Sequence, residues 1–212
     1  MRVVLAIALL AAAVSPAYAQ PKDPLPTFVV DVRGLFAKLG QDTTTAADLG
    51  VAAQELPGTA IGGAAAVNFY PLRKEKMSLG FGAEGLLARA TAQQAANAQT
   101  GALEGPRIER RLQGISGTIS LNFGHGQGWS YVSAGIGPLR FQTFAGDLPS
   151  GAATPFQMTQ NLGAGARWFT NNHVAFCFDL RFYLTKPEQT TIEYAGRLRQ
   201  RVLVISAGIS IK

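Results

Sequence analysis

Eight segments of the chain alternate apolar residues with polar or small ones at every second position, the period of a β-strand that has a different environment on each face. They lie near 27–39, 59–70, 77–89, 111–123, 129–142, 156–169, 173–185 and 199–212. The connections between them alternate in length, with long ones at 40–58, 90–110, 143–155 and 186–198 and short ones at 71–76, 124–128 and 170–172. This combination is typical of membrane barrels. We therefore predict an all-β fold, an eight-stranded antiparallel up-and-down transmembrane β-barrel.

The first nineteen residues fall outside this pattern and have the features of a secretory signal peptide. Arg2 is followed by the apolar run Val3–Val14 and by a small-x-small site that ends at Ala19. The run is shorter than the roughly 20 residues that a spanning helix needs. We expect cleavage after residue 19, so that 20–212 forms a single barrel domain. Because Cys177 is the only cysteine, no intramolecular disulfide can form.

The alternation also separates two faces on each strand. In 59–70, one face carries Ile61, Val67 and Phe69, whereas the other carries alanine and glycine with Asn68 and Tyr70. Alternation alone leaves open a soluble, lipocalin-like barrel with the apolar face inside. However, glycine, alanine and serine dominate the face that carries the charges, and they suit a tight lumen better than a solvent-exposed coat. We therefore predict that the apolar face contacts lipid. In the fifth strand, Gly137-Pro138 predicts a bulge that shifts the alternation.

The connection lengths predict the orientation in the membrane. Bacterial outer-membrane barrels have short periplasmic turns and long extracellular loops, so both termini are expected in the periplasm. Aromatic residues with outward parity lie near the short-turn rim, where they would form an interfacial girdle. They are Phe28, Phe69, Phe123 and Trp168.

The run Gly163–Tyr183, GAGARWFTNNHVAFCFDLRFY, resembles the penultimate hairpin of the OmpA/OmpX-type small outer-membrane barrels. The strand pattern extends this resemblance over the whole length after residue 19. The resemblance implies a bacterial outer-membrane location, a monomer, and insertion by the barrel insertion machinery. One feature departs from the family: members usually end in an aromatic residue that this machinery reads, whereas the chain ends Ile209-Ser210-Ile211-Lys212.

Six charged residues fall on the inward face, three of each sign. They are Asp31, Arg33, Glu84, Arg167, Asp179 and Arg181. An eight-stranded barrel is only wide enough to be filled by side chains, and an unpaired buried charge is costly. We therefore predict a closed ion-pair network that plugs a polar lumen. The alternative is a small passive pore.

A second group of charges lies at the long-loop rim with outward parity. It comprises Lys38, Arg89, Arg111 and Arg201, together with Lys186, and Arg107, Arg197 and Arg199 if the strands continue beyond the membrane. Guanidinium groups bind phosphate bidentately, so these residues are candidates for binding lipopolysaccharide. The alternative is a solvated rim that only terminates the apolar band.

The remaining features narrow the function classes. A formal net charge of +6 is compatible with nucleic-acid binding, but no recognition motif accompanies it. Barrel enzymes that modify lipid A use a histidine near the outer leaflet, whereas His125 and His173 lie near short turns. No metal-ligand spacing occurs, and no cofactor is expected. We predict a structural outer-membrane barrel, not an enzyme, that serves envelope integrity or surface interaction, with a passive pore or a lipid A-modifying enzyme as alternatives.

Overall fold

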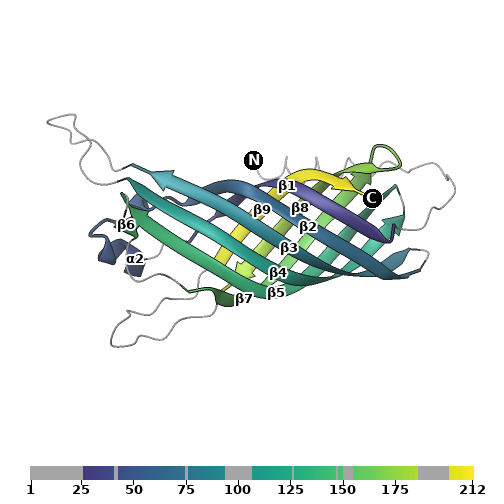
Figure 1. Ribbon diagram of the computed structural model, residues 1–212, viewed down its shortest axis with the longest axis horizontal. Helices are drawn as coiled ribbons and strands as arrows, with labels where there is room; N and C mark the ends of the chain where they lie inside the picture. Colours follow the sequence, from purple (N-terminus) through teal and green to yellow (C-terminus); the bar gives the residue numbers. More distant parts are fainter. Residues whose placement is uncertain are drawn as a thin grey trace, which may run out of the picture.

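The computed structural model describes residues 26–40, 43–74, 76–93, 107–125, 127–146, 148–149, 155–185 and 201–212, and all structural statements refer to these. Eight long strands form the wall (Figure 1): β1 (Phe28–Lys38), β2 (Thr59–Arg73), β3 (Met77–Ala92), β4 (Ile108–His125), β5 (Gly128–Ala145), β7 (Gln157–Phe169), β8 (Val174–Leu184) and β9 (Arg201–Ile211). Three short elements accompany them: α2 (Thr43–Asp48), the 3-10 helix η1 (Ala53–Glu55) and β6 (Leu148–Pro149). The predicted signal peptide, 1–19, lies outside the described residues.

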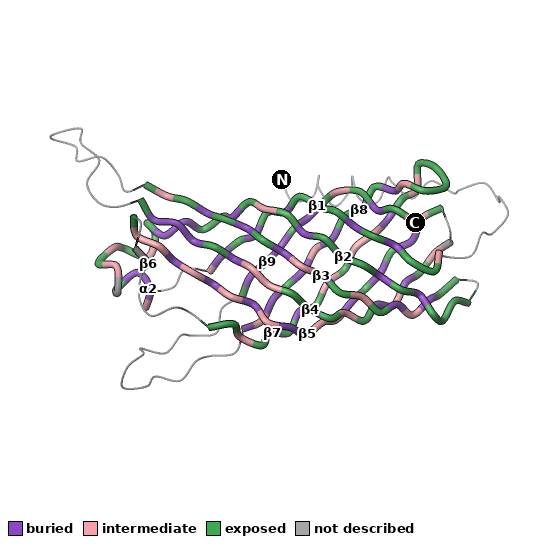
Figure 2. The backbone as a smooth tube through the Cα atoms, viewed as in Figure 1, coloured by how far each residue is buried: buried purple, intermediate pink, exposed green. Residues whose placement is uncertain are grey.

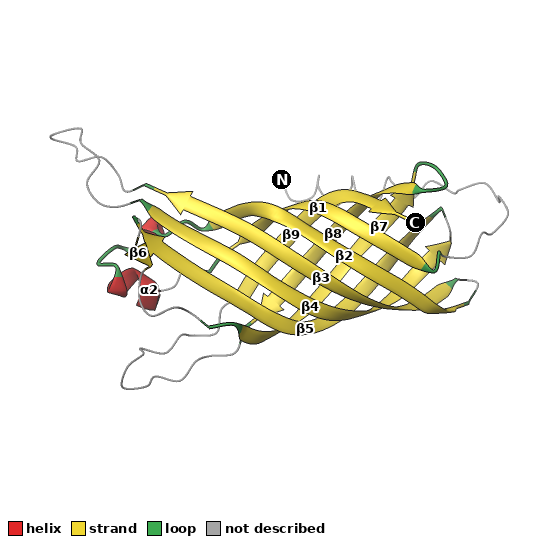
Figure 3. Cartoon of the chain, viewed as in Figure 1, coloured by secondary structure: helices red, strands yellow, loops and turns green. Residues whose placement is uncertain are grey.

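The long strands close into a barrel in which every neighbouring pair is antiparallel. The wall runs β4-β3-β2-β1-β9-β8-β7-β5, and β5 pairs with β4 to complete the ring. At the seam between the first and last strands, β1 pairs with β9 from Val30 opposite Ile211 to Lys38 opposite Leu203. Closure pairs the backbone groups that an open sheet edge would expose. The predicted eight-stranded antiparallel barrel is confirmed, and Figure 3 shows its strands as one tilted wall.

Within the described ranges, no helix is long and apolar enough to cross a membrane.

The two faces of the wall differ as the alternation predicts. In β1, buried and exposed residues alternate without interruption (Figure 2). Large apolar side chains point outward, such as Phe36, Ile61 and Phe176, whereas Asp31 and Arg33 are buried inside. A soluble protein rarely exposes such a continuous apolar surface. The lipocalin-like alternative is therefore wrong, because the apolar face is the outer one.

Three strands extend further toward the long-loop rim than the sequence pattern predicted. β3 continues to Ala92, β4 begins at Ile108 and β5 continues to Ala145. Crossing a bilayer takes about 9–11 residues per strand, whereas these strands have 16, 18 and 18. The excess residues extend the wall at the long-loop rim.

The predicted bulge at Gly137-Pro138 is wrong. β5 keeps one register with β4 on both sides of this dipeptide and pairs with β7 through it, Pro138 standing opposite Met158. The close approach of β4 explains how the strand passes without an extra residue. A Cβ atom on Gly137 would lie 2.1 Å from the carbonyl oxygen of Ile115, so the missing side chain makes room for the neighbouring backbone. Inward and outward positions therefore do not exchange along β5.

A register shift does occur in β2, between Phe69 and Leu72. This interval contains Pro71, which cannot donate a hydrogen bond to the ladder, and bulges are a common way to place such a residue. The first short connection was expected to begin at Pro71, but β2 continues through it to Arg73.

The long connection 40–58 contains structure that the sequence pattern did not predict. Its helices α2 and η1 bring Ala46 and Leu56 against Ile108, on the inner face of β4. Leu49, Val51 and Ala53 pack against the same cluster. In addition, the buried Arg110 donates hydrogen bonds to the carbonyl oxygens of Gly40 and Pro57, at 3.0 and 3.4 Å. The segment is thus attached to the inner wall at the long-loop rim (Figure 1).

Candidate functional site

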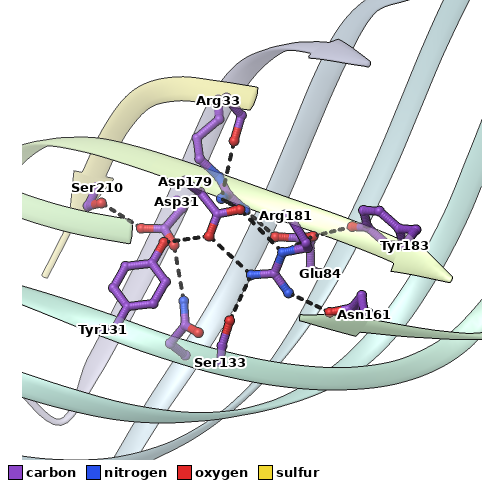
Figure 4. A network of polar contacts seen from close by, with 12 residues as sticks. Asp31, Arg33, Glu84, Tyr131, Ser133, Asn161, Asp179, Arg181, Tyr183 and Ser210 are labelled. Carbon is purple, nitrogen blue, oxygen red and sulfur yellow. Dashed lines mark hydrogen bonds and ion pairs between the residues drawn. The ribbon is translucent and has the colours of Figure 1, made fainter. Parts of the chain in front are cut away.

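The centre of the lumen holds two arginines and two carboxylates from three strands. Arg33 of β1 pairs with Glu84 of β3 and, at 3.4 Å, with Asp179 of β8. Arg181, also on β8, pairs with Asp179 at 3.2 Å and with Glu84 at 3.4 Å. Each cation therefore contacts both anions, and Figure 4 shows the four side chains converging. All four residues have inward parity, which brings their side chains together in the lumen.

The remaining two predicted lumen charges form a second pair beside this centre. The Arg167 guanidinium donates to both carboxylate oxygens of Asp31, with the Nε–Oδ1 distance at 3.0 Å. Asp31 also accepts hydrogen bonds from Asn68 and Ser210. Tyr131 connects the two groups, because its ring lies 4.6 Å from the Arg167 guanidinium and its hydroxyl donates to Asp179 at 2.8 Å.

Neutral polar side chains complete the network, and the sequence analysis missed them. Tyr183 donates to Glu84 at 2.8 Å, while Arg181 donates to Asn161 at 2.8 Å and to Ser133 at 3.3 Å. Their inward parity was visible in the sequence. Their role in the network was not visible, because the sequence pattern does not show which charged group an uncharged polar residue will contact. The network satisfies buried charges as low-dielectric interiors require.

The lumen is not polar along its whole length, which corrects the sequence-based expectation. Toward the long-loop rim, an apolar cluster fills it: Leu35, Ala37, Leu39, Ala60, Ala64, Leu86, Ala88, Ala90, Leu112, Leu139, Phe141, Tyr183, Val202 and Val204. Toward the short-turn rim lie Val29, Tyr70, Trp129 and Tyr131, with Phe169 against them. The charged network is thus a middle layer between two apolar layers.

Little space remains in the charged layer. A cavity lined by both charge groups, among them Asp31, Arg33, Glu84 and Arg167, has a volume of about 10 Å³. That is room for roughly one water molecule. The described part of the lumen is therefore filled by its own side chains, as expected for eight strands.

The predicted outward basic residues lie on the outer surface, and two of them meet. Arg89 of β3 and Arg111 of β4 stand opposite each other, with side chains 55% and 52% exposed. Both contact Glu109, a partner that the sequence analysis missed. Its strand extends beyond the predicted start at 111, so Glu109 was assigned to the loop. Arg111 also lies 4.6 Å from the ring of Phe144.

A further outward arginine was missed because of the bulge predicted in β5. A shift in parity there would have turned Arg140 into the lumen. Instead it stands opposite Gln113 on the outer wall, with its guanidinium 5.5 Å from the ring of Phe156. The outer basic cluster therefore comprises Arg89, Arg111 and Arg140, with Glu109 as its acidic member.

Three of the other predicted basic residues, Lys38, Arg107 and Arg201, lie in the described part of the chain. Lys38 and Arg201 are exposed on the paired strands β1 and β9, with Lys38 opposite Leu203. Arg107 is exposed just before β4. Lys186, Arg197 and Arg199 lie outside the described residues.

The aromatic residues assigned to the girdle are exposed near the short turns. Phe28 and Phe69 pair across β1 and β2 with ring centroids 4.8 Å apart, and Phe123 and Trp168 are 41% and 51% exposed.

The histidines are far from the outer basic cluster along the barrel. His173 is exposed in the short connection before β8, and His125 ends β4 at the same rim. Among the residues that the structure describes, no group of three or more histidine, cysteine, aspartate or glutamate side chains is arranged to hold a metal ion. Cys177 is buried in the lumen.

Neither a protein-family model nor the sequence of a curated protein matches the chain. The fold does resemble solved structures. Neisserial surface protein A shares 12% sequence identity over 88% of this chain and 97% of its own, with a TM-score of 0.51. The Escherichia coli outer membrane protease OmpT shares 8% sequence identity over 92% of this chain and 99% of its own, with a TM-score of 0.48. Yersinia pestis Ail, solved with a heparin analogue, shares 11% sequence identity over 86% of this chain and 97% of its own, with a TM-score of 0.46. The closed ring of eight antiparallel strands and the likeness to neisserial surface protein A show that the chain has the fold of the small eight-stranded outer-membrane β-barrels.

Proposed function

We propose that the chain is a sealed barrel of the bacterial outer membrane, with both termini in the periplasm. It serves envelope integrity or surface interactions through its outer wall and long loops, not through a channel. The exposed apolar wall supports the location, since outer-membrane barrels present such a band to lipid. The short connections at one rim support the orientation.

The observation that carries this proposal is the filled charged layer. Arg33 and Arg181 each contact both Glu84 and Asp179, so the charges of these four side chains balance within this layer. Conduction requires sites that an ion enters and leaves readily. The cavity of about 10 Å³ at this level is too small for a hydrated ion. A passive pore is therefore disfavoured.

An enzyme acting on lipid A is the less favoured alternative. Such chemistry needs a general base close to the acyl or phosphate groups of the outer leaflet. The two histidines, His125 and His173, belong to the opposite rim.

We also propose that outward basic residues bind lipopolysaccharide phosphate. Lys38, Arg89, Arg111 and Arg201 are exposed on the lipid-facing side near the long-loop rim. In the proposed orientation, this rim lies in the outer leaflet. Arginine suits the role because its planar guanidinium offers two parallel donors to a phosphate.

Planar-bilayer recordings test the sealed lumen. The folded wild-type protein should leave the membrane current at its baseline in concentrated potassium chloride, because the central ion pairs and the apolar layers fill the cross-section. Heat-modifiable gel mobility of the same sample shows that the barrel is folded. Long-lived current steps of uniform size from that sample would contradict the proposal and restore the passive pore.

A further inference from the structure

A hollow runs over the lipid-facing side of the wall next to the outer basic cluster. Its volume is about 1040 Å³. Small residues with outward parity, Gly63, Ala65 and Gly85, form its floor, whereas larger apolar side chains such as Leu87 and Ile115 stand at its sides. We call this hollow the wall groove.

The wall groove continues into the basic cluster. A second hollow, of about 230 Å³, is lined by Arg89 and Arg111 and shares Leu87 and Gln113 with the wall groove. Along β3, Arg89 lies four residues beyond Gly85, or about 13 Å at 3.3 Å per residue. An apolar channel on the surface therefore ends at a pair of guanidinium groups at the long-loop rim.

The cluster carries an excess of positive charge. Two arginines, Arg89 and Arg111, share one carboxylate, Glu109, so these three described side chains carry a net charge of +1. Glu109 contacts one nitrogen of each of two guanidiniums, and each guanidinium has five N–H donors. The rings of Phe144 and Phe156 lie against Arg111 and Arg140. Within the described part of the chain, Arg89 and Arg111 therefore keep donors for an anion, and Phe144 already positions Arg111.

We propose that the wall groove and the basic cluster together hold one molecule of lipid A, with its phosphate on the arginines and one acyl chain along the groove. The inference rests on the proposed outer-membrane orientation and refines the proposed lipopolysaccharide binding to a defined site. Charge complementarity selects an anionic lipid, and the apolar groove selects an acylated one. The arginines belong to three adjacent strands, which stand about 4.8 Å apart, so the cluster spans more than one phosphate oxygen and suits a large phosphorylated head group.

Another hollow on the outer wall serves as a control for the wall groove. It measures about 690 Å³ and is lined by residues that include Phe81, Gly117, Ile136 and Leu162, with no basic residue among them. It should bind ordinary lipid tails without preference for an anionic head group.

Filling each hollow with one leucine makes a matched pair of variants. A Cβ atom on Gly85 would meet the Ile115 side chain at 3.8 Å, and one on Gly117 would meet the Ile136 carbonyl oxygen at 4.0 Å. Both are ordinary contacts, so Gly85→Leu and Gly117→Leu should leave the backbone in place. Only Gly85→Leu occupies the proposed acyl site.

The test is native mass spectrometry of the refolded protein released from micelles that contain lipid A. The wild type should retain one lipid A, and Gly117→Leu should retain it equally. Gly85→Leu and the double variant Arg89→Gln/Arg111→Gln should each reduce retention about tenfold or more, as expected for losing interactions with a charged group. Dephosphorylated lipid A should bind the wild type as weakly as phosphorylated lipid A binds the arginine variant.

The outcomes distinguish acyl-chain binding in the wall groove from phosphate binding by the basic cluster. Normal retention by Gly85→Leu with loss in the arginine variant would overturn the acyl site and leave phosphate binding by the cluster. Normal retention by both would overturn lipopolysaccharide binding at this cluster as well. Equal competition by phosphatidylglycerol would overturn the assignment to lipid A. Gel mobility of each variant must show a folded barrel, and the Gly117→Leu sample controls for the added leucine.

Discussion

Replacing Asp31 by alanine should destabilise the barrel by about 3–5 kcal/mol, the usual cost of removing one partner of a buried ion pair. The Arg167 guanidinium would stay in the lumen, 3% exposed, without the carboxylate that it contacts through two nitrogens. Asn68 and Ser210 would lose their acceptor too. Urea-induced unfolding in detergent, followed by tryptophan fluorescence, measures the change.

Two further variants identify the cause. The double variant Asp31→Ala/Arg167→Met should recover part of the lost stability, because it removes the stranded charge. Glu55→Ala, an exposed carboxylate in η1, should cost about 1 kcal/mol or less. If Asp31→Ala unfolded at the wild-type urea concentration, the lumen would be hydrated enough to solvate Arg167, and the account of a dry, paired interior would be wrong.

Replacing Gly208 by alanine should weaken closure of the barrel by about 3 kcal/mol or more, at the upper end of what overpacking costs. Gly208 lies on β9 opposite Arg33 of β1, at the seam between the ends of the wall. An added Cβ atom would lie 2.0 Å from the Val32 carbonyl oxygen and 2.6 Å from the Arg33 Cα atom. Because these atoms belong to the backbone, they cannot move without displacing the strand.

A second glycine at the same seam serves as the control. At Gly34, the nearest atom to an added Cβ is the Ala207 carbonyl oxygen, 4.0 Å away. Gly34→Ala should therefore fold like the wild type, whereas Gly208→Ala should give a smaller folded fraction and a lower melting temperature by heat-modifiable gel mobility. Equal behaviour of the two variants would show that the close approach at Gly208 does not govern closure.

The period of two was sufficient to predict the strands and their faces. A barrel that is filled inside and in contact with lipid outside requires apolar residues at every second position of each strand. Phe36 and Asp31 could therefore be assigned to opposite faces without any contact being known. The six lumen charges followed from the same rule. Their partners could be predicted only as a group, because a specific pair such as Arg33 and Glu84 depends on strand stagger and side-chain reach.

Other features depended on interactions that a single segment does not reveal. Pro138 predicted a bulge, but the close approach of β4 at Gly137 allows the strand to continue in register. Because of that predicted bulge, Arg140 was not predicted on the outer face. Glu109 was assigned to a loop because β4 was predicted to begin only at residue 111. The helix α2 was missed because its six residues are stabilised by packing against Ile108, which is distant in the sequence.

Cysteine labelling tests whether the lumen is closed to water. Two engineered cysteines at exposed positions give the labelling rates with which a buried cysteine is compared. In a Cys177→Ser background, Ala47→Cys on α2 and Asn172→Cys in the last short turn place an exposed thiol at opposite rims. With the proposed orientation, a membrane-impermeant thiol reagent should label Ala47→Cys on intact cells and Asn172→Cys only after the outer membrane is permeabilised.

The most direct measurement uses the native Cys177, which lies in the lumen, 4% exposed, opposite Arg167. A small charged methanethiosulfonate reagent is added to the folded wild-type barrel in lipid vesicles, and the modified fraction is followed by mass spectrometry. A sealed lumen predicts essentially no modification while the barrel is folded and complete modification in urea. Modification of folded Cys177 at a rate similar to that of Asn172→Cys would show that water and ions reach the centre of the barrel, which would contradict a plugged lumen.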